Sequence, residues 1–253
     1  MESRDFLLAV KKHPERYFIV HYSSQSLYDD DQQGLSPRIT SIVVRHLATG
    51  QTVSFAMHAV AEELGIAREN IVERYDRIEG ELLERFYAFV RDRRVQNWVH
   101  WNMRNLVYGF EHLEHRYRAL LHKDAPQIPV EVRINLNDIL KDRYGSDFAP
   151  DPRMINLMKI NGDLDQRFLD GAGEAEAFRN GQFIRMNSST MSKVDFFAHV
   201  ISLMQAGKLR TAANSLGAWI DRLLESRAAK SVALVSGVIG IAAALIEFIV
   251  LFH

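Results

Sequence analysis

The sequence predicts an α/β domain, a mixed sheet flanked by helices, followed by a C-terminal transmembrane helix. Three runs rich in aromatic and β-branched residues come first, within residues 17–57, and such runs are typical of strands. From His58 to Arg91 the apolar residues instead recur at helical spacing. The last 23 residues, Ser231 to His253, carry a single formal charge. These three features together set the predicted fold class.

The N-terminal part predicts a three-stranded antiparallel start. A tight turn at Ala48-Thr49-Gly50 joins the second and third runs, which favours a β-hairpin. A short helix or lead-in precedes the first run and ends at Pro14, since proline disrupts a continuing helix. The elements expected here are a helix at 3–13 and strands at 17–22, 39–47 and 51–57.

The middle of the chain alternates between the two periodicities. We expect helices at 71–91, 108–121, 136–144, 152–162 and 190–206, and strands at 97–101 and 130–134. Residues 163–187 contain Gly171, Gly173 and Gly181 and interrupt the helical pattern. They are predicted to be an excursion between helices, either a partner-contact loop or a tolerated surface insertion.

Composition limits the classes of protein that fit. The chain has 31 Lys and Arg against 32 Asp and Glu and an isoelectric point near 6.8, so bulk charge gives no support for nucleic-acid binding. It has no cysteine, which excludes disulfides and thiolate metal sites. No P-loop, GxGxxG, GxSxG or HExxH pattern occurs. The expected organisation is a domain at 1–207, an amphipathic helical connector at 208–230, with its helix beginning near Arg210, and a span at 231–253.

The final segment is long enough to cross a bilayer. A helix of 23 residues reaches roughly 34 Å, against a hydrocarbon core of about 30 Å. Arg222, Arg227 and Lys230 precede it and no basic residue follows. By the positive-inside rule, we expect a single-pass tail anchor in the inner (cytoplasmic) membrane, with the N-terminal domain in the cytoplasm.

The predicted span also carries a pattern for helix association. Ser236, Gly240 and Ala244 are spaced four apart, and Glu247 falls on the same face. One interpretation is a homo-oligomer whose contact includes Glu247, because an ionisable group within an apolar span suggests a functional site. The alternative is that Glu247 is hydrated near the far interface.

The element order and several local strings resemble the DEDD-type 3′–5′ exonucleases, which have the RNase H-like fold. That family carries Asp-x-Glu after three apolar residues of its first strand, and here Phe18-Ile19-Val20 precedes His21-Tyr22-Ser23. Arg38-Ile39 is similar to the start of the family's second strand. Its middle motif is similar to the string from His100 to Asn105, and its last motif to the string from Thr190 to Asp195. The resemblance covers roughly residues 17 to 206.

The departures from the family pattern predict a degenerate site. The four acid positions would hold His21, Ser23, Asn105 and Asp195, and the general-base histidine position would be Thr190. Two-metal nucleases need several carboxylates to hold their cations, because Mg²⁺ prefers anionic oxygen ligands. We therefore expect no catalytic residue, metal or cofactor here.

A group of residues around the fourth strand is a candidate ligand site. Aromatic rings, amides and a guanidinium could stack on and hydrogen-bond a base or nucleotide. The alternative is that the tryptophans belong to the core. The residues are Trp98, His100, Trp101, Asn102 and Arg104.

Two other groups of residues are candidates for a metal or catalytic site. Asp29-Asp30-Asp31 is acidic, but three adjacent carboxylates point in different directions, which favours a solvated turn. Glu111 and His115 are four apart on a predicted helix and could share a cation, although an exposed charged face is the simpler interpretation.

Three function classes remain. The first is a non-catalytic nuclease-like sensor of nucleic acid, nucleotide or partner protein, coupled to a membrane effector helix. That architecture resembles proteins of bacterial antiviral defence or toxin systems. The second is a membrane-tethered, active metal-dependent exonuclease, and the third is a plain tethered scaffold.

Overall fold

The computed structural model describes residues 1–25, 36–104 and 107–212. Its strands are β1 (Tyr17–Ser24), β2 (Ile39–His46), β3 (Thr52–Ala56), β4 (Asn97–His100) and β5 (Arg133–Asn135). Its helices are α1 (Ser3–Lys12), α2 (Met57–Glu63), α3 (Tyr75–Arg91), α4 (Phe110–Leu121), α5 (Leu136–Tyr144), α6 (Arg153–Asn161), α7 (Gly171–Arg179) and α8 (Phe183–Ala206). Short 3₁₀ turns lie at Pro14–Arg16, Arg68–Asn70, Val72–Arg74 and Val130–Val132.

Within the described residues the strands form one mixed sheet in the order β3-β2-β1-β4-β5. β1 pairs antiparallel with β2, and β2 pairs antiparallel with β3, as the turn at Gly50 predicts. β4 and β5 run parallel to β1, with Tyr17 opposite Asn97 and Trp98 opposite Arg133. The predicted α/β class with a mixed sheet flanked by helices is therefore confirmed.

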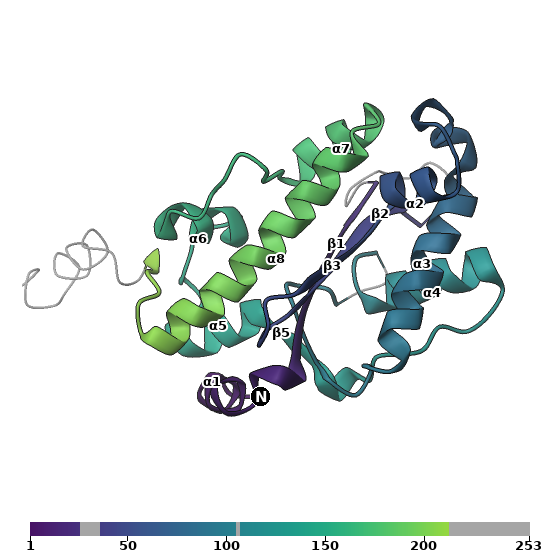
Figure 1. Cartoon of the computed structure of the whole chain (residues 1–253). Coiled ribbons are helices and arrows are strands. Elements are labelled where there is room, and N and C mark those ends of the chain that lie inside the picture. Colours follow the sequence, from purple (N-terminus) through teal and green to yellow (C-terminus); the bar gives the residue numbers. More distant parts are fainter. Residues whose placement is uncertain (26–35, 105–106, 213–253) are drawn as a thin grey trace, which may run out of the picture.

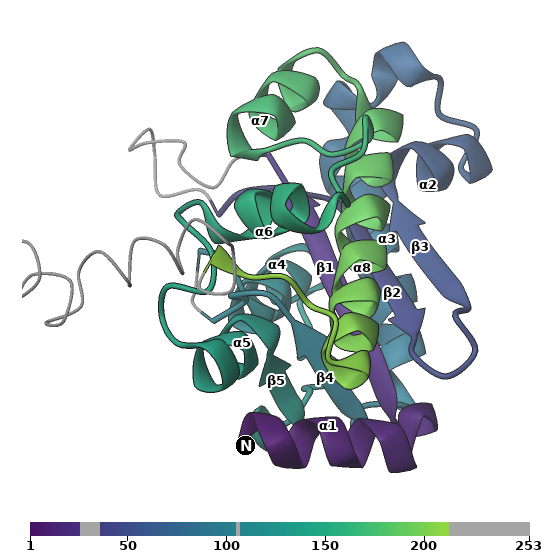
Figure 2. The ribbon, with the colours of Figure 1, turned by 90° about the vertical axis from the view of Figure 1, so that its left-hand side faces the viewer.

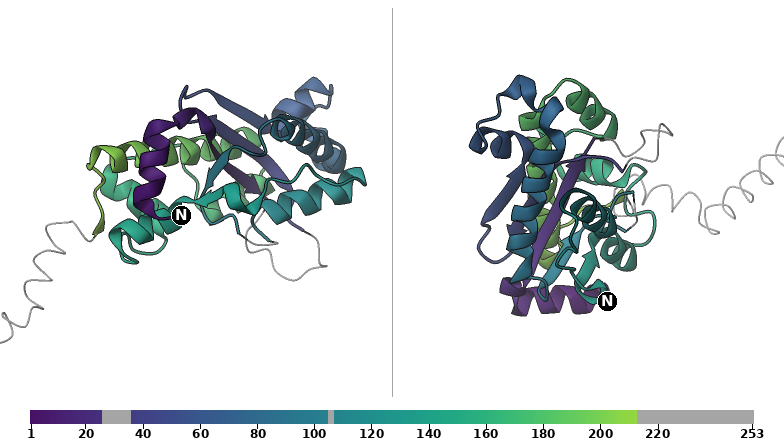
Figure 3. Two further views of the ribbon diagram at one scale, coloured as in Figure 1. Left: turned by 90° about the horizontal axis from the view of Figure 1, so that it is seen from below. Right: turned by 90° about the vertical axis from the view of Figure 1, so that its right-hand side faces the viewer.

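Helices cover both faces of the sheet (Figure 1). α2, α3 and α4 pack on one face, where Val20 and Trp98 point into a core with Leu82 and Leu113. α1, α5, α6 and most of α8 pack on the other face, where Ile19 and Val99 enter a second core. Figure 2 shows α8 lying along β1 and β2, and Figure 3 shows α1 crossing one end of the sheet. Alternation along β1 thus divides its side chains between two cores.

The structure adds helices that the sequence pattern did not predict. α2 follows β3 directly, and α7 lies within the glycine-containing segment that was expected to be an excursion. Glycine disfavours a helix interior, but Asp170 caps α7 by accepting a hydrogen bond from the backbone N–H of Gly173 at 2.8 Å. The ring of Phe178 also stacks on Tyr75, with centroids 5.5 Å apart. Capping and tertiary packing together outweigh the low local propensity.

The chain leaves the end of α8 in a non-helical conformation. Lys208 to Thr211 are not helical, so the connector helix expected from Arg210 does not begin there. The backbone of Arg210 instead exchanges hydrogen bonds with the side chain of Asn161 at 2.9 and 3.0 Å. Among the described residues, no helix combines the length and apolar character that a membrane crossing requires. The predicted span at 231–253 lies outside them, as does the rest of the connector.

Candidate functional site

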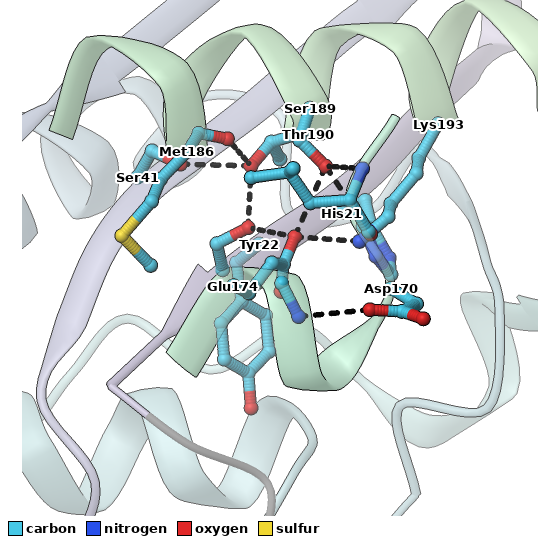
Figure 4. A network of polar contacts seen from close by, with 12 residues as sticks. His21, Tyr22, Ser41, Asp170, Glu174, Met186, Ser189, Thr190 and Lys193 are labelled. Atoms are coloured by element: carbon cyan, nitrogen blue, oxygen red, sulfur yellow. Dashed lines mark hydrogen bonds and ion pairs between the residues drawn. The ribbon is translucent and has the colours of Figure 1, made fainter. Parts of the chain in front are cut away.

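The β1 polar cluster surrounds Ser23, one of the four positions that the family resemblance aligns with metal-binding acids. It consists of Ser23 on β1, Ser41 on β2, Glu174 on α7, and Ser189, Thr190 and Lys193 on α8, all buried (Figure 4). Strand alternation turns Ser23 to the side of the sheet on which the N-terminal half of α8 lies. Helical spacing places Ser189, Thr190 and Lys193 within one turn of each other.

Glu174 is the acceptor at the centre of this cluster. Its Oε1 accepts hydrogen bonds from Ser23 Oγ at 2.8 Å, Ser189 Oγ at 3.2 Å and Lys193 Nζ at 2.5 Å. The Lys193 ammonium also lies over the ring of Phe168, 5.2 Å from its centroid. The side chains of Glu174 and Lys193 are 10% and 7% exposed, so this is a buried ion pair.

Hydroxyl groups complete the cluster on the side of β2. Thr190 Oγ1 lies 2.7 Å from Ser23 Oγ and 2.8 Å from Ser41 Oγ, and it donates to the carbonyl of Met186 at 3.0 Å. The structure therefore brings together two of the sequence-predicted positions, Ser23 and Thr190. A threonine hydroxyl that donates to its own helix has no basicity to contribute at this position.

His21 lies two residues before Ser23 and is also buried. Burial lowers the pKa of its imidazole well below the usual 6.5, and the positive charge of Lys193 acts in the same direction. Its ring packs edge-on against Phe197, with centroids 5.4 Å apart. A neutral imidazole against an aromatic ring does not replace a carboxylate as a ligand for Mg²⁺.

Asp195, another of the four predicted acid positions, is separate from the β1 polar cluster. Asp195 accepts a hydrogen bond from Arg45 at 3.1 Å and lies 3.7 Å from Arg167, and its side chain is 42% exposed. It belongs to a surface ion-pair group, and it makes no contact with Ser23 or Thr190 among those described. Asn105 lies outside the described residues.

The chemistry of the β1 polar cluster differs from that of a two-metal centre. Its single carboxylate is already neutralised by Lys193, and a cation would have to displace that ammonium from a buried site. The described part of the chain contains no group of three His, Asp or Glu side chains arranged to hold a metal. The cluster instead holds α7, α8 and the sheet together through hydrogen bonds.

The second candidate site is a cleft at the carboxyl ends of β4 and β5. This β5 cleft has a volume of about 470 Å³. α4, which follows β4, packs on one face of the sheet, whereas α5, which follows β5, packs on the other. Such a change of side between adjacent parallel strands opens a crevice where α/β proteins commonly bind ligands. The ionisable residues that line it are His100, Arg104, Glu111, Glu131, Arg133 and Asp138.

His100 connects the cleft to the predicted ligand site. Burial lowers its pKa to about 3, with further lowering by Arg104 and Arg133, so the ring is neutral at physiological pH. Its Nδ1 accepts a hydrogen bond from the backbone N–H of Met103 at 3.2 Å, which places the proton on Nε2. The side chain is almost fully buried and lines the cleft.

Arg104 lines the cleft, and Asn102 contacts Arg104 from outside the lining. Asn102 has a left-handed backbone, with φ 53°, and its Oδ1 accepts from Arg104, Asn135 and Asn137 at 3.0–3.2 Å. Arg104 also donates to Asp138 at 2.8 Å. Of the predicted ligand-site residues, His100 and Arg104 thus line the cleft, and Asn102 hydrogen-bonds to Arg104.

The two tryptophans of the predicted ligand site lie in the cores. Trp98 is fully buried, stacks on Phe18 with centroids 5.5 Å apart, and donates from Nε1 to the carbonyl of Arg93 at 3.2 Å. Trp101 stacks on Phe197 at 5.6 Å. Neither lines the cleft, so the core interpretation of these two residues fits the structure.

The pair Glu111 and His115 forms no metal site among the described residues. Glu111 Oε1 accepts from Arg133 Nη1 at 2.5 Å, and His115, the potential second ligand, is exposed. The other carboxylate oxygen of Glu111, Oε2, is buried without a hydrogen-bond partner in the described part of the chain. Asp29-Asp30-Asp31 lies outside that part, as do the membrane-helix residues Ser236, Gly240, Ala244 and Glu247.

Sequence reasoning missed Glu174 and Lys193. Glu174 stands in a glycine-containing segment that carries no helix signal, and its partner is 19 residues away on α8. The only available signal was Lys193 itself, a lysine on the apolar face of a helix next to Val194 and Phe197. Such a position calls for a buried counter-charge, since an unpaired buried charge is strongly destabilising.

Comparison with known proteins gives no relative. No protein family, curated protein or solved structure matches this chain.

Proposed function

We propose that this protein is a membrane-tethered, non-catalytic domain of the RNase H-like, exonuclease-like type, which senses a ligand and couples its binding to a C-terminal membrane segment. The observation that carries the proposal is the ion pair between Glu174 and Lys193. It lies beside Ser23, where a nuclease of that type would hold its cations, and it leaves no free carboxylate for them. Bacterial antiviral defence or a toxin system is the setting that the architecture favours.

The sheet supports the fold part of the proposal. It starts with three antiparallel strands, continues with two strands parallel to β1, and is covered by helices on both faces. This is the element order on which the resemblance rests. The ligand part is supported by the β5 cleft, which gathers His100 and Arg104 at the carboxyl ends of the parallel strands.

A nuclease assay tests the non-catalytic part. Purified full-length protein is incubated with end-labelled single-stranded DNA and RNA in Mg²⁺ or Mn²⁺. No trimming is expected in either metal, because the described residues contain no carboxylate set that could hold two cations. Metal-dependent trimming that disappears in Glu174→Gln but persists in Asp195→Asn, with both variants folded by circular dichroism, would instead favour a membrane-tethered active exonuclease.

Overexpression tests the membrane part. The full chain is expected in the membrane fraction, and a chain ending at Lys230 in the soluble fraction. Loss of membrane potential should require residues 231–253, because the segment is the proposed effector. A full-length chain that stays soluble contradicts the anchor, and a membrane-bound chain that leaves the potential unchanged reduces it to a tethered scaffold.

A further inference from the structure

We propose that the β5 cleft binds an extended peptide segment of a partner protein that carries a basic side chain, lysine or arginine. The proposal rests on the proposed function, since it names the ligand that the sensing domain takes. It is carried by the exposed carboxylate of Glu131 in the lining, by the position of β5 at the sheet edge, and by one buried oxygen, Glu111 Oε2, that has no hydrogen-bond partner in the described part of the chain.

Charged groups of both signs line the cleft, and they include Met1, whose α-ammonium is positive. The lining side chains comprise two arginines and three carboxylates. Arg133 is held by Glu111 and by Glu114, at 2.5 and 3.1 Å, and Arg104 is held by Asp138. Glu131 is exposed and has no ion-pair partner in the described part of the chain. A cationic group is the complement of such an unpaired carboxylate.

The same charge argues against a phosphate ligand. Proteins that bind nucleic acid through its backbone present arginine and lysine side chains with free N–H donors. Here both arginines already donate to carboxylates, and Glu131 adds an unpaired negative charge beside them. An oligonucleotide or nucleotide would therefore find both arginines already paired with carboxylates.

The position of the cleft favours a peptide over a small amine. It follows β5 and the turn before it, with Val130, Glu131, Ile134 and Asn135 in its lining. β5 is the last strand of the sheet in the described residues, and pairs on one side only, with β4. An edge strand leaves alternate backbone N–H and C=O groups directed outward, and an added peptide strand satisfies them.

One atom of the lining residues matches a basic side chain of a peptide. Glu111 Oε2 is an acceptor without a partner, and an ammonium or guanidinium supplies N–H donors. The exposed side chain of Val130 gives the peptide an apolar contact in the same cleft.

Fluorescence anisotropy tests the proposal on purified full-length protein in detergent. The probe is a fluorescein-labelled, end-blocked hexapeptide of alternating valine and arginine. Matched peptides carry citrulline, a neutral isostere, or glutamate in place of arginine. We expect the arginine peptide to bind at least tenfold more tightly than the citrulline peptide, and the glutamate peptide not to bind.

Variants of the protein localise the binding. Glu131→Gln should weaken the arginine peptide about fivefold, and Glu131→Lys should abolish binding. Glu176→Gln, a change at an exposed acid on α7 outside the cleft, should leave it unchanged. Because Glu131 is exposed, these changes do not threaten folding.

Each contrary result has a definite meaning. Equal binding of the citrulline peptide, or full binding by Glu131→Lys, overturns the proposal. Arginine amide that binds as tightly as the peptide overturns the edge-strand part, and ATP or oligothymidylate that displaces the peptide overturns the charge argument. The nuclease and membrane assays report on the proposed function independently of all these outcomes.

Discussion

Lys193 Nζ lies 2.5 Å from Glu174 Oε1 and joins α8 to α7 behind Ser23 of the central strand. Removing two charges from water costs several kcal/mol each, and only good geometry offsets this. The three hydrogen bonds to Glu174 Oε1 supply that geometry. The pair therefore occupies the proposed former cation site in a form that is stable only while both partners are present.

Breaking this pair should destabilise the fold, and removing both charges should not. We expect Lys193→Met or Glu174→Gln alone to lower the free energy of unfolding by about 3–5 kcal/mol, because each leaves a buried uncompensated group. The double variant should recover most of that loss. Urea denaturation measures all three. A double variant as unstable as the worse single one would show that the hydroxyl network, and not the charge pair, holds α7.

Asp195 provides the matched comparison on the same helix. It pairs with Arg45 at 3.1 Å, but its side chain is 42% exposed. Asp195→Asn should therefore change the free energy of unfolding by less than about 1 kcal/mol. A loss as large as that of Glu174→Gln would mean that Asp195 takes part in a buried network. The same denaturation experiment decides this.

The stability of the fold should fall as the pH drops below about 6.5. Burial lowers the pKa of His100 to about 3 and that of His112 to about 4, and also lowers that of His21. The unfolded chain then binds protons that the folded chain does not, so stability is complete above pH 6.5 and is lost toward the folded pKa values. Between pH 7.5 and 5.5 His100 and His112 should each remove roughly 1.4 kcal/mol.

His112 offers the control for this pH dependence. Its Nδ1 lies 2.9 Å from the Tyr22 hydroxyl, and its Nε2 lies 2.9 Å from the carbonyl of Pro37, so both ring nitrogens are occupied. In His112→Gln the difference in unfolding free energy between pH 7.5 and 5.5 should shrink by roughly 1.4 kcal/mol. An unchanged difference would mean that His112 is charged in the folded protein. Urea denaturation at both pH values makes the measurement.

Most of the sheet could be predicted from the sequence, whereas the site could be predicted only in part. The runs that begin at Tyr17 and Ile39 are rich in apolar and β-branched residues, so a few residues of local sequence are enough to predict each strand. The contact between Ser23 and Glu174 spans 151 positions and depends on a helix with weak local propensity. Periodicity carries no information about which buried polar side chains will meet. His100 and Arg104 could be predicted to lie together because His100 ends β4 and Arg104 follows it by four residues, so they are close in space as well as in sequence.

Trp98 and Trp101 allow a further test. Their aromatic rings suggested stacking on a ligand, whereas their buried positions indicate packing in the cores. Trp98 is fully buried and Trp101 nearly so, and neither lines the β5 cleft. In a Trp219→Phe background, which leaves these two as the only tryptophans, their emission should be shifted to the blue and resist acrylamide quenching. Adding nucleotides or the arginine peptide should leave it unchanged, since neither ligand reaches the rings. Trp98→Ala should cost about 3–5 kcal/mol of unfolding free energy. A ligand-dependent change in the emission of Trp98, in a Trp101→Phe variant of the same background, would place a binding surface against the core and contradict the assignment of the cleft.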